Sequence, residues 1–183
     1  MQVSDALTGS INLPSAGREV GDFELISRIT LNSAQAIVTF GGIPQNYKHI
    51  QLKGQIMTSG ATNPTWSVNS DSTSSRYRGH HFWGTGATSS SNAQAGYNGV
   101  YFGYNPSATY PSVFTMDWID YAHTSKFKTF KGFAGSDTNG GTVEVALWSG
   151  LYMSTDAINS ITLNGNSANF VSGSVFSLYG IRG

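Results

Sequence analysis

The fold is decided by AINSITL at residues 157–163, NGN at 164–166 and NFVSGSVFSLYGI at 169–181. This stretch is typical of two short β-strands joined by a Gly/Asn turn. A segment near a chain end stays ordered only where a sheet holds it. We therefore expect the second strand to be a structural part of a sheet.

The second of these strands is apolar on both faces. Because side chains alternate along a strand, one face carries Val175, Tyr179 and Ile181, and the other carries Phe176 and Leu178. A strand in a sandwich needs only one apolar face. We therefore expect something to cover the second face, and a neighbouring subunit is one candidate.

The rest of the sequence predicts one strand after another, and apolar residues nowhere recur at helical spacing over a long stretch. The first strand, at 23–31, alternates so that Phe23, Leu25, Ile29 and Leu31 are expected on one face. Further strands are expected at 36–40, 49–58, 66–69, 77–83, 112–121, 126–134 and 142–152. Residues 84–109 are rich in Gly, Ser, Ala and Asn, which predicts a long surface loop with one small strand near 97–104.

Many short strands separated by turn signals predict an all-β protein, and we expect an antiparallel β-sandwich with jelly-roll-like strand order. Residues 1–22 are polar and without clear periodicity, so an extended N-terminal arm is expected there. No interior linker divides the remainder. Residues 23–183 are therefore expected to form a single β-sandwich domain.

The chain carries unusually little charge. Only 11% of its residues are charged, with ten acidic and ten basic side chains and a net charge of zero, whereas soluble domains usually have about 25%. A neutral chain lacks the clustered Lys and Arg that bind nucleic acid. Neutrality also weakens the solubility of a free monomer, which favours a protein that works within an assembly.

Several further classes are excluded by what the sequence lacks. It contains no cysteine, which rules out disulfides, thiol catalysis and zinc-thiolate sites. The first residues show no basic segment followed by an apolar run, and no run of about 20 apolar residues is present. We therefore expect a chain that folds in a cytoplasm and has no membrane partner.

The densest group of functional side chains is RYRGHHFW at residues 76–83. Neighbouring side chains on a strand point to opposite faces, so His80 and His81 are poorly placed to bind one metal ion together. Arg, Tyr and Trp are enriched where proteins contact partners. We expect this strand to meet a partner or a ligand, and the candidate contacts are Arg76, Arg78, His81 and Trp83.

A second group of candidate contacts is Trp148 and Tyr152, on the face opposite Val145, Leu147 and Leu151. Together with Trp83, Tyr101 and Tyr104 they form a possible platform for sugar rings. Packing in the core or between subunits is the favoured alternative.

No catalytic residue is expected. Asp117 and Asp120 lie three residues apart on a strand, and Glu144 lies on another, so the paired carboxyls of a glycosidase are not indicated. No Gly-x-Ser-x-Gly elbow is present. Residues 69–73 lack the glycine and glutamate of a calcium loop and fit Asx/Ser turns better. We expect no cofactor and no metal.

Two segments carry a family resemblance. They are IPQNYKHIQL at residues 43–52 and GSVFSLYGI at residues 173–181. With VNSD at 68–71 and the order of strands, they resemble a group of small virion proteins of tailed bacteriophages. The likeness spans most of the chain from about residue 23 and is loosest over residues 84–110.

The resemblance implies a non-enzymatic β-sandwich component of the virion, assembled in the host bacterial cytoplasm. We expect a capsid decoration or cement protein that stabilises the shell, with itself (as a dimer or trimer) and the major capsid protein as partners. The alternative is a tail-fibre or receptor-binding module that binds a host-surface glycan. A polysaccharide depolymerase is the least favoured possibility. The resemblance implies no catalytic residues.

Overall fold

The computed structural model describes residues 22–95, 99–103, 106–137, 139 and 143–183. The arm expected at residues 1–22 lies, apart from Asp22, outside the described residues. Helix among the described residues is limited to one short 3-10 turn, η1 (Ser74–Arg76), and none has the length and apolarity needed to cross a membrane.

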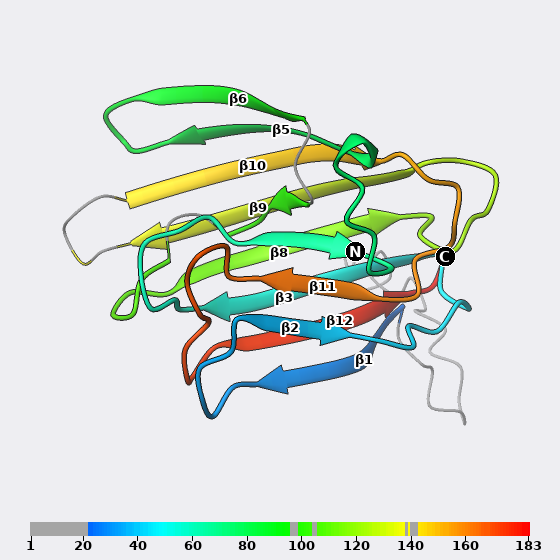
Figure 1. Ribbon diagram of the computed structural model, residues 1–183, viewed down its shortest axis with the longest axis horizontal. Coiled ribbons are helices and arrows are strands. Elements are labelled where there is room, and N and C mark those ends of the chain that lie inside the picture. Colours follow the sequence, from blue (N-terminus) through cyan, green and yellow to red (C-terminus); the bar gives the residue numbers. More distant parts are fainter. Residues whose placement is uncertain (1–21, 96–98, 104–105, 138, 140–142) are drawn as a thin grey trace, which may run out of the picture.

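The described residues form two antiparallel sheets packed face to face (Figure 1). The larger sheet has the order β1-β12-β3-β8-β9-β10-β5-β6, and the smaller has the order β2-β11-β4-β7. The strands are β1 (Phe23–Thr30), β2 (Ile37–Phe40), β3 (His49–Ile56), β4 (Thr65–Val68), β5 (Tyr77–Gly84), β6 (Ser89–Ala95), β7 (Val100–Tyr101), β8 (Ser112–Ile119), β9 (Lys128–Asp137), β10 (Val143–Tyr152), β11 (Ile161–Asn164) and β12 (Val175–Ile181).

The strand order is that of a jelly roll with additions. Without β5, β6, β9 and β10, the two sheets read β1-β12-β3-β8 and β2-β11-β4-β7, which is the strand order of a jelly roll built from two Greek keys. The four other strands extend the larger sheet beside β8, and together they are named the extension. The predicted all-β sandwich of jelly-roll type is thus confirmed.

The stretch that decides the fold joins the two sheets. Its strands, β11 and β12, do not pair with each other: β11 lies between β2 and β4, and β12 lies between β1 and β3. The segment between them crosses from one sheet to the other, and on the way Phe170 forms β-bridges with Gln35 and Thr58. Residues 157–181 therefore supply an interior strand to each layer.

The two apolar faces of β12 have different surroundings. Phe176 and Leu178 are fully buried between the sheets, whereas Val175, Tyr179 and Ile181 are half-buried on the outer face. There the ammonium of Lys53 lies 5.2 Å from the ring centroids of both Phe23 and Tyr179, a cation–π arrangement. Part of the cover expected for this face therefore comes from the chain itself.

Strand β1 corrects one prediction. The sequence alternation placed Phe23, Leu25, Ile29 and Leu31 on one face, but the register against β12 shifts between Leu25 and Ser27. This bulge adds one residue and reverses the alternation. Phe23 and Leu25 are consequently about half exposed on the outer face, while Ile29 packs against the core.

Residues 84–109 differ most from expectation. The predicted loop contains β6, a seven-residue strand that pairs with β5 without interruption from Ser89 to Ala95. Its sequence, SSSNAQA, shows no apolar alternation. The strand buries only the side chain of Gln94, so it needs no apolar face. The small strand expected near 97–104 is present as β7, in the other sheet.

The core is aromatic and joins the two layers. Trp66 of β4 is fully buried, and its ring centroid lies 5.1 Å from that of Trp118, 4.7 Å from that of Phe130 and 6.1 Å from that of Tyr77, each in an edge-to-face arrangement. Trp118 and Phe130 belong to the larger sheet. One side chain of the smaller sheet thus anchors the interface between the layers.

The two segments that carry the family resemblance contact each other. Strands β3 and β12 are neighbours, with Ile181 opposite His49 and Leu178 opposite Leu52. The N–H of Lys48 donates to the carbonyl of Ile181 at 2.8 Å. Tyr47 is buried over Gly180, and a Cβ at Gly180 would lie 2.4 Å from ring atoms of Tyr47. Glycine is therefore required sterically at this position.

We expect Gly180→Ala to lower the free energy of unfolding by about 1–3 kcal/mol, since the methyl group forces Tyr47 out of its packed position. Urea denaturation followed by fluorescence measures the change. The matched control is Gly60→Ala, because a Cβ at Gly60 has no neighbour within 4 Å; its effect should stay within about 0.5 kcal/mol. Equal effects at both positions would contradict the steric explanation.

Candidate interaction surface

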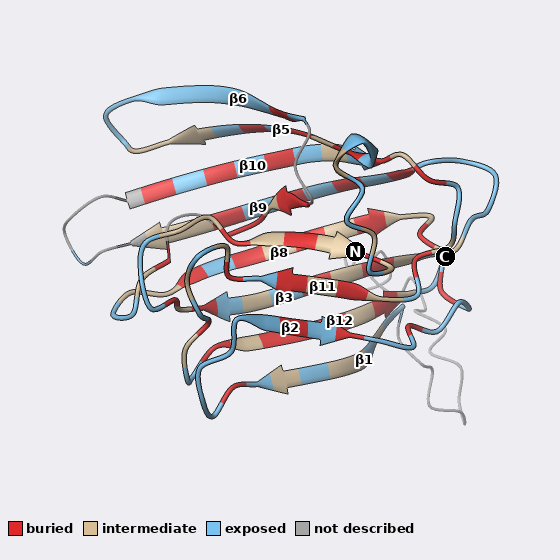
Figure 2. Cartoon of the chain, in the orientation of Figure 1, coloured by how far each residue is buried: buried red, intermediate tan, exposed pale blue. Residues whose placement is uncertain are grey.

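Large apolar side chains are exposed on the outer face of the extension and of neighbouring β8. Val113 is 53% exposed, Phe82 51%, Phe133 49%, Leu147 48% and Val145 43%. These five residues are named the extension patch. The alternation of buried and exposed residues along β8, β9 and β10 is visible in Figure 2.

The strand register makes this patch continuous. Leu147 of β10 lies directly opposite Phe82 of β5 on one side and Phe133 of β9 on the other. In the next row, Val145 lies opposite Gly135, which in turn lies opposite Val113. Residues opposite each other in a ladder touch, so Phe82, Leu147 and Phe133 form one apolar row. Val145 and Val113 lie in the adjacent row, on either side of Gly135 and next to Leu147 and Phe133, so the patch is a single apolar area. Exposed areas of this kind mark sites of interaction.

The register of β10 corrects a prediction about its faces. Trp148 and Tyr152 were candidate contacts for a partner or a ligand, but they are 4% and 1% exposed and belong to the core, in agreement with the favoured alternative of core packing. On this inner face the ring centroid of Tyr152 lies 5.2 Å from that of Tyr77. The exposed face of β10 is the aliphatic one.

Strand β5 likewise directs some of the predicted contact residues toward the inner face. His81 is buried and stacks on Trp83 at 4.7 Å with an interplanar angle of 24°, on the side that faces Tyr101 of β7. Burial lowers the pKa of His81, so its ring is neutral at pH 7. The outer face of β5 instead presents His80 and Phe82, which were not among the predicted contacts. Arg78 is half-buried, and its guanidinium donates to the carbonyl of Tyr77.

A shallow hollow of about 630 Å³ lies on this outer face. Phe82 and Leu147 border it, and His80, Ser91, Ala93 and Ser149 are among the residues that line it. The hollow therefore combines an aromatic ring and an aliphatic side chain with hydroxyl and imidazole groups. Among the other aromatic residues of the possible sugar platform, Tyr104 lies outside the described residues.

The carboxylates considered for catalysis are separately engaged. Asp117 accepts a hydrogen bond from the side-chain amide of Gln51 at 2.6 Å and lies 3.6 Å from the ammonium of Lys131. Asp120 forms an ion pair with Lys126. In the part of the chain that the structure describes, no three His, Asp or Glu side chains gather as metal ligands would.

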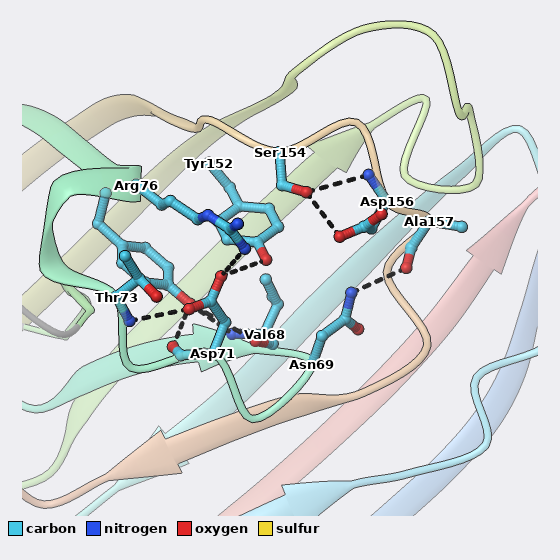
Figure 3. Close-up of polar contacts among 10 residues, drawn as sticks. Val68, Asn69, Asp71, Thr73, Arg76, Tyr152, Ser154, Asp156 and Ala157 are labelled. Atoms are coloured by element: carbon cyan, nitrogen blue, oxygen red, sulfur yellow. Dashed lines mark hydrogen bonds and ion pairs between the residues drawn. The ribbon is translucent and has the colours of Figure 1, made fainter.

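Arg76 and Tyr152 meet at a third residue, Asp71, at the other end of β5 (Figure 3). The carboxylate of Asp71 accepts hydrogen bonds from the guanidinium of Arg76 at 2.8 Å and from the hydroxyl of Tyr152 at 2.7 Å. It also accepts one from the backbone N–H of Thr73 at 2.8 Å, which closes an Asx turn. The turn predicted for residues 69–73 is confirmed.

This group of contacts is named the Asp71 cluster: Asp71, Thr73, Arg76, Tyr77 and Tyr152. Tyr77 donates to the backbone carbonyl of Asp71 at 2.8 Å. Burial by itself would raise the pKa of Asp71, but the hydrogen bonds from Thr73, Tyr152 and Arg76 outweigh it and hold that pKa well below its usual range. The carboxylate is therefore charged at every ordinary pH and serves as a structural anchor.

The turn before Asp71 is tied to the stretch that decides the fold. Asn69 and Ser70 both have positive φ, at 53° and 55°, and the N–H of Asp71 donates to the carbonyl of Val68. The side chain of Asn69 donates to the carbonyl of Ala157 at 2.9 Å and accepts from the N–H of Asn159 at 2.9 Å. These hydrogen bonds fix the position of residues 157–159, which lead into β11.

Comparison of the chain with models of known protein families, with curated proteins and with solved structures gives no match. The arrangement itself defines an all-β sandwich that presents a broad apolar face and a hollow. The site is therefore suited to binding a surface.

Proposed function

We propose that this chain is a non-enzymatic structural protein of a bacteriophage virion, a capsid decoration protein that binds the major capsid protein through the extension patch. The observation that carries the proposal is the position of that patch. Its five exposed apolar side chains lie on and beside strands that are additions to the jelly roll. A continuous apolar area on an added part of a fold is best explained by a partner.

The charge of the chain supports the same proposal. With a net charge of zero and 11% charged residues, association is driven by apolar contact and is only weakly opposed by repulsion. A protein that binds the assembled shell and not its free subunits stabilises the shell by mass action. The resemblance of residues 43–52 and 173–181 to virion proteins is consistent with this role.

The test is binding to shells that lack the protein, prepared from the phage that encodes it. We expect Leu147→Glu to weaken binding by at least about 30-fold, because a carboxylate in the centre of the patch is desolvated without a partner. Ile37→Glu is the matched control, since Ile37 is 53% exposed but lies in β2 of the other sheet. Sedimentation of shells with bound protein measures both variants.

Restoring the wild-type protein should also raise the temperature at which such particles release DNA. Unchanged DNA release, or equal binding by Leu147→Glu and Ile37→Glu, would contradict the decoration role. Counting the copies of this protein in purified virions distinguishes a location on the capsid from one on the tail, because hundreds of copies indicate the capsid and a handful indicate the tail.

The hollow beside Phe82 favours a second candidate, a glycan-binding module of the tail. Sugar rings stack on exposed aromatic rings, while hydroxyl and imidazole groups such as those of Ser91 and His80 bind sugar hydroxyls. Under this alternative, Phe82→Ala abolishes binding to host polysaccharide on a glycan array. An array without any hit for the wild-type protein would exclude it.

A further inference from the structure

The two sheets end in four edge strands, and β6 differs from the other three. In the smaller sheet the edges β2 and β7 are only four and two residues long. At the far edge of the larger sheet, β1 is interrupted by its bulge and carries Glu24 and Arg28. Short length, bulges and charges are the usual means by which proteins keep edges from pairing.

Strand β6 has none of these protections. It pairs with β5 over its whole length with no register shift, and its sequence contains no charged residue and no proline. It is exposed except at Gln94 (Figure 2). Among the described residues, no strand pairs with its other side. A straight edge of this kind is a template for another strand.

Backbone hydrogen-bonding groups are also available at the free edge of β6. The N–H of Ala93 donates to the side-chain oxygen of its own neighbour, Asn92, at 2.8 Å. In an antiparallel ladder every second residue directs its N–H and C=O away from the paired strand. The alternate residues of β6, which include Ser91 and Ala93, therefore present backbone groups at the free edge, and a strand carbonyl can replace the local bond to Asn92.

We propose that β6 pairs antiparallel with β6 of a second copy of this chain, about a two-fold axis at Asn92. The pairing would set Ser91 against Ala93, Ser90 against Gln94 and Asn92 against itself. A charged side chain at the axis would lie directly opposite its own copy and repel it, whereas Asn92 and the rest of β6 carry no charge. The inference concerns the isolated chain and does not rest on the proposed virion role.

A closed dimer is favoured over an open fibre because the two edge strands of the larger sheet, β1 and β6, differ. Pairing of β6 with β1 of a neighbour would be heterologous and would propagate as a fibre. The bulge and charges of β1 oppose that contact, whereas β6 is self-complementary, so the association closes as a dimer. Both copies would then present their extension patches on one continuous sheet of twice the width.

The first experiment measures the mass of the full chain in solution by sedimentation equilibrium. Because the interface is one strand pair, we expect dissociation in the micromolar range, with dimers dominant near about 200 µM. Ser91→Lys should give monomers over the same range, since it places an ammonium at the pairing edge on each side of the axis. Ser91→Thr is the matched control and should remain dimeric.

The second experiment tests the register by using the absence of native cysteine. Asn92→Cys should form a disulfide-linked dimer under mild oxidation, because residues opposite each other on the axis have Cα atoms about 4.5–5.5 Å apart. Ser90→Cys should not, since two residues at position 90 would be offset by about 13 Å along the strands. Near-ultraviolet circular dichroism verifies that each variant is folded.

Dimers that Ser91→Lys dissociates, together with selective crosslinking at position 92, are the expected results. A wild-type chain that stays monomeric at about 200 µM, or a dimer that a folded Ser91→Lys variant retains, would overturn the proposal. Equal crosslinking at positions 90 and 92 would overturn the two-fold register. None of these results depends on binding to shells, so failure here leaves the proposed virion role to its own test.

Discussion

Replacement of Trp66 by alanine is expected to lower the free energy of unfolding by about 4 kcal/mol, within the range of about 3–5 kcal/mol found for buried aromatic residues. The indole is fully buried and lies edge-to-face against Trp118 and Phe130. Its removal leaves a cavity between the two layers that neither sheet can close without breaking its own ladder. Guanidinium denaturation measures the change.

The matched control for Trp66→Ala is Phe127→Ala. Phe127 is also aromatic, but it is 50% exposed and lies outside the strands, so its removal should cost less than about 1 kcal/mol. If Trp66→Ala shifts the unfolding free energy no more than Phe127→Ala does, the two sheets are not held together at this point.

The second large effect is expected at the Asp71 cluster. Asp71→Asn retains the shape of the side chain but removes the charge that accepts hydrogen bonds from Arg76, Tyr152 and Thr73. Hydrogen bonds to a charged group contribute about 1.5–3 kcal/mol. We therefore expect a loss of about 2–3 kcal/mol at pH 7, measured by urea denaturation.

The pH dependence of this effect follows from the lowered pKa of Asp71. In the unfolded chain the carboxyl titrates near its usual value of about 3.9, and in the folded protein it titrates lower. The stabilisation is present above about pH 4 and is lost as the pH falls further. The difference between wild-type protein and Asp71→Asn should thus shrink between pH 5 and about pH 2.

Asp22→Asn is the control for Asp71→Asn. Asp22 is exposed and immediately precedes β1, away from the Asp71 cluster. This substitution should change the unfolding free energy by about 0.5 kcal/mol or less at every pH. A constant gap between wild-type protein and Asp71→Asn from pH 7 to pH 2 would show that the charge of Asp71 does not stabilise the fold.

Alternation of apolar residues was sufficient to predict the sandwich. Ile50, Leu52 and Ile56 alternate with polar residues along β3, and all three are fully buried. The same rule failed in β1, because a bulge is not visible in the apolar pattern. It also failed in β6, where a polar strand is held by its ladder to β5 and buries almost nothing.

The candidate surface was harder to predict because several strands are apolar on both sides. In β10 the pattern could not show whether Trp148 or Leu147 faces the core, and the larger side chain proved to be the buried one. The Asp71 cluster was likewise invisible, since Asp71 and Tyr152 lie 81 positions apart in the sequence. Only the pairing of β10 with β5 brings them together.

The location of β12 has a consequence for how the chain folds as it is made. This strand completes the ladder between β1 and β3, yet residues 175–181 are synthesised long after both. The ribosome must therefore release most of the sequence before the larger sheet can close. Until then, the edges of β1 and β3 that pair with β12 stay unpaired. Contacts so distant in sequence slow folding, and exposed edges invite aggregation meanwhile. Folding of this domain should therefore be slow, with sheet edges exposed until residues 175–181 are in place.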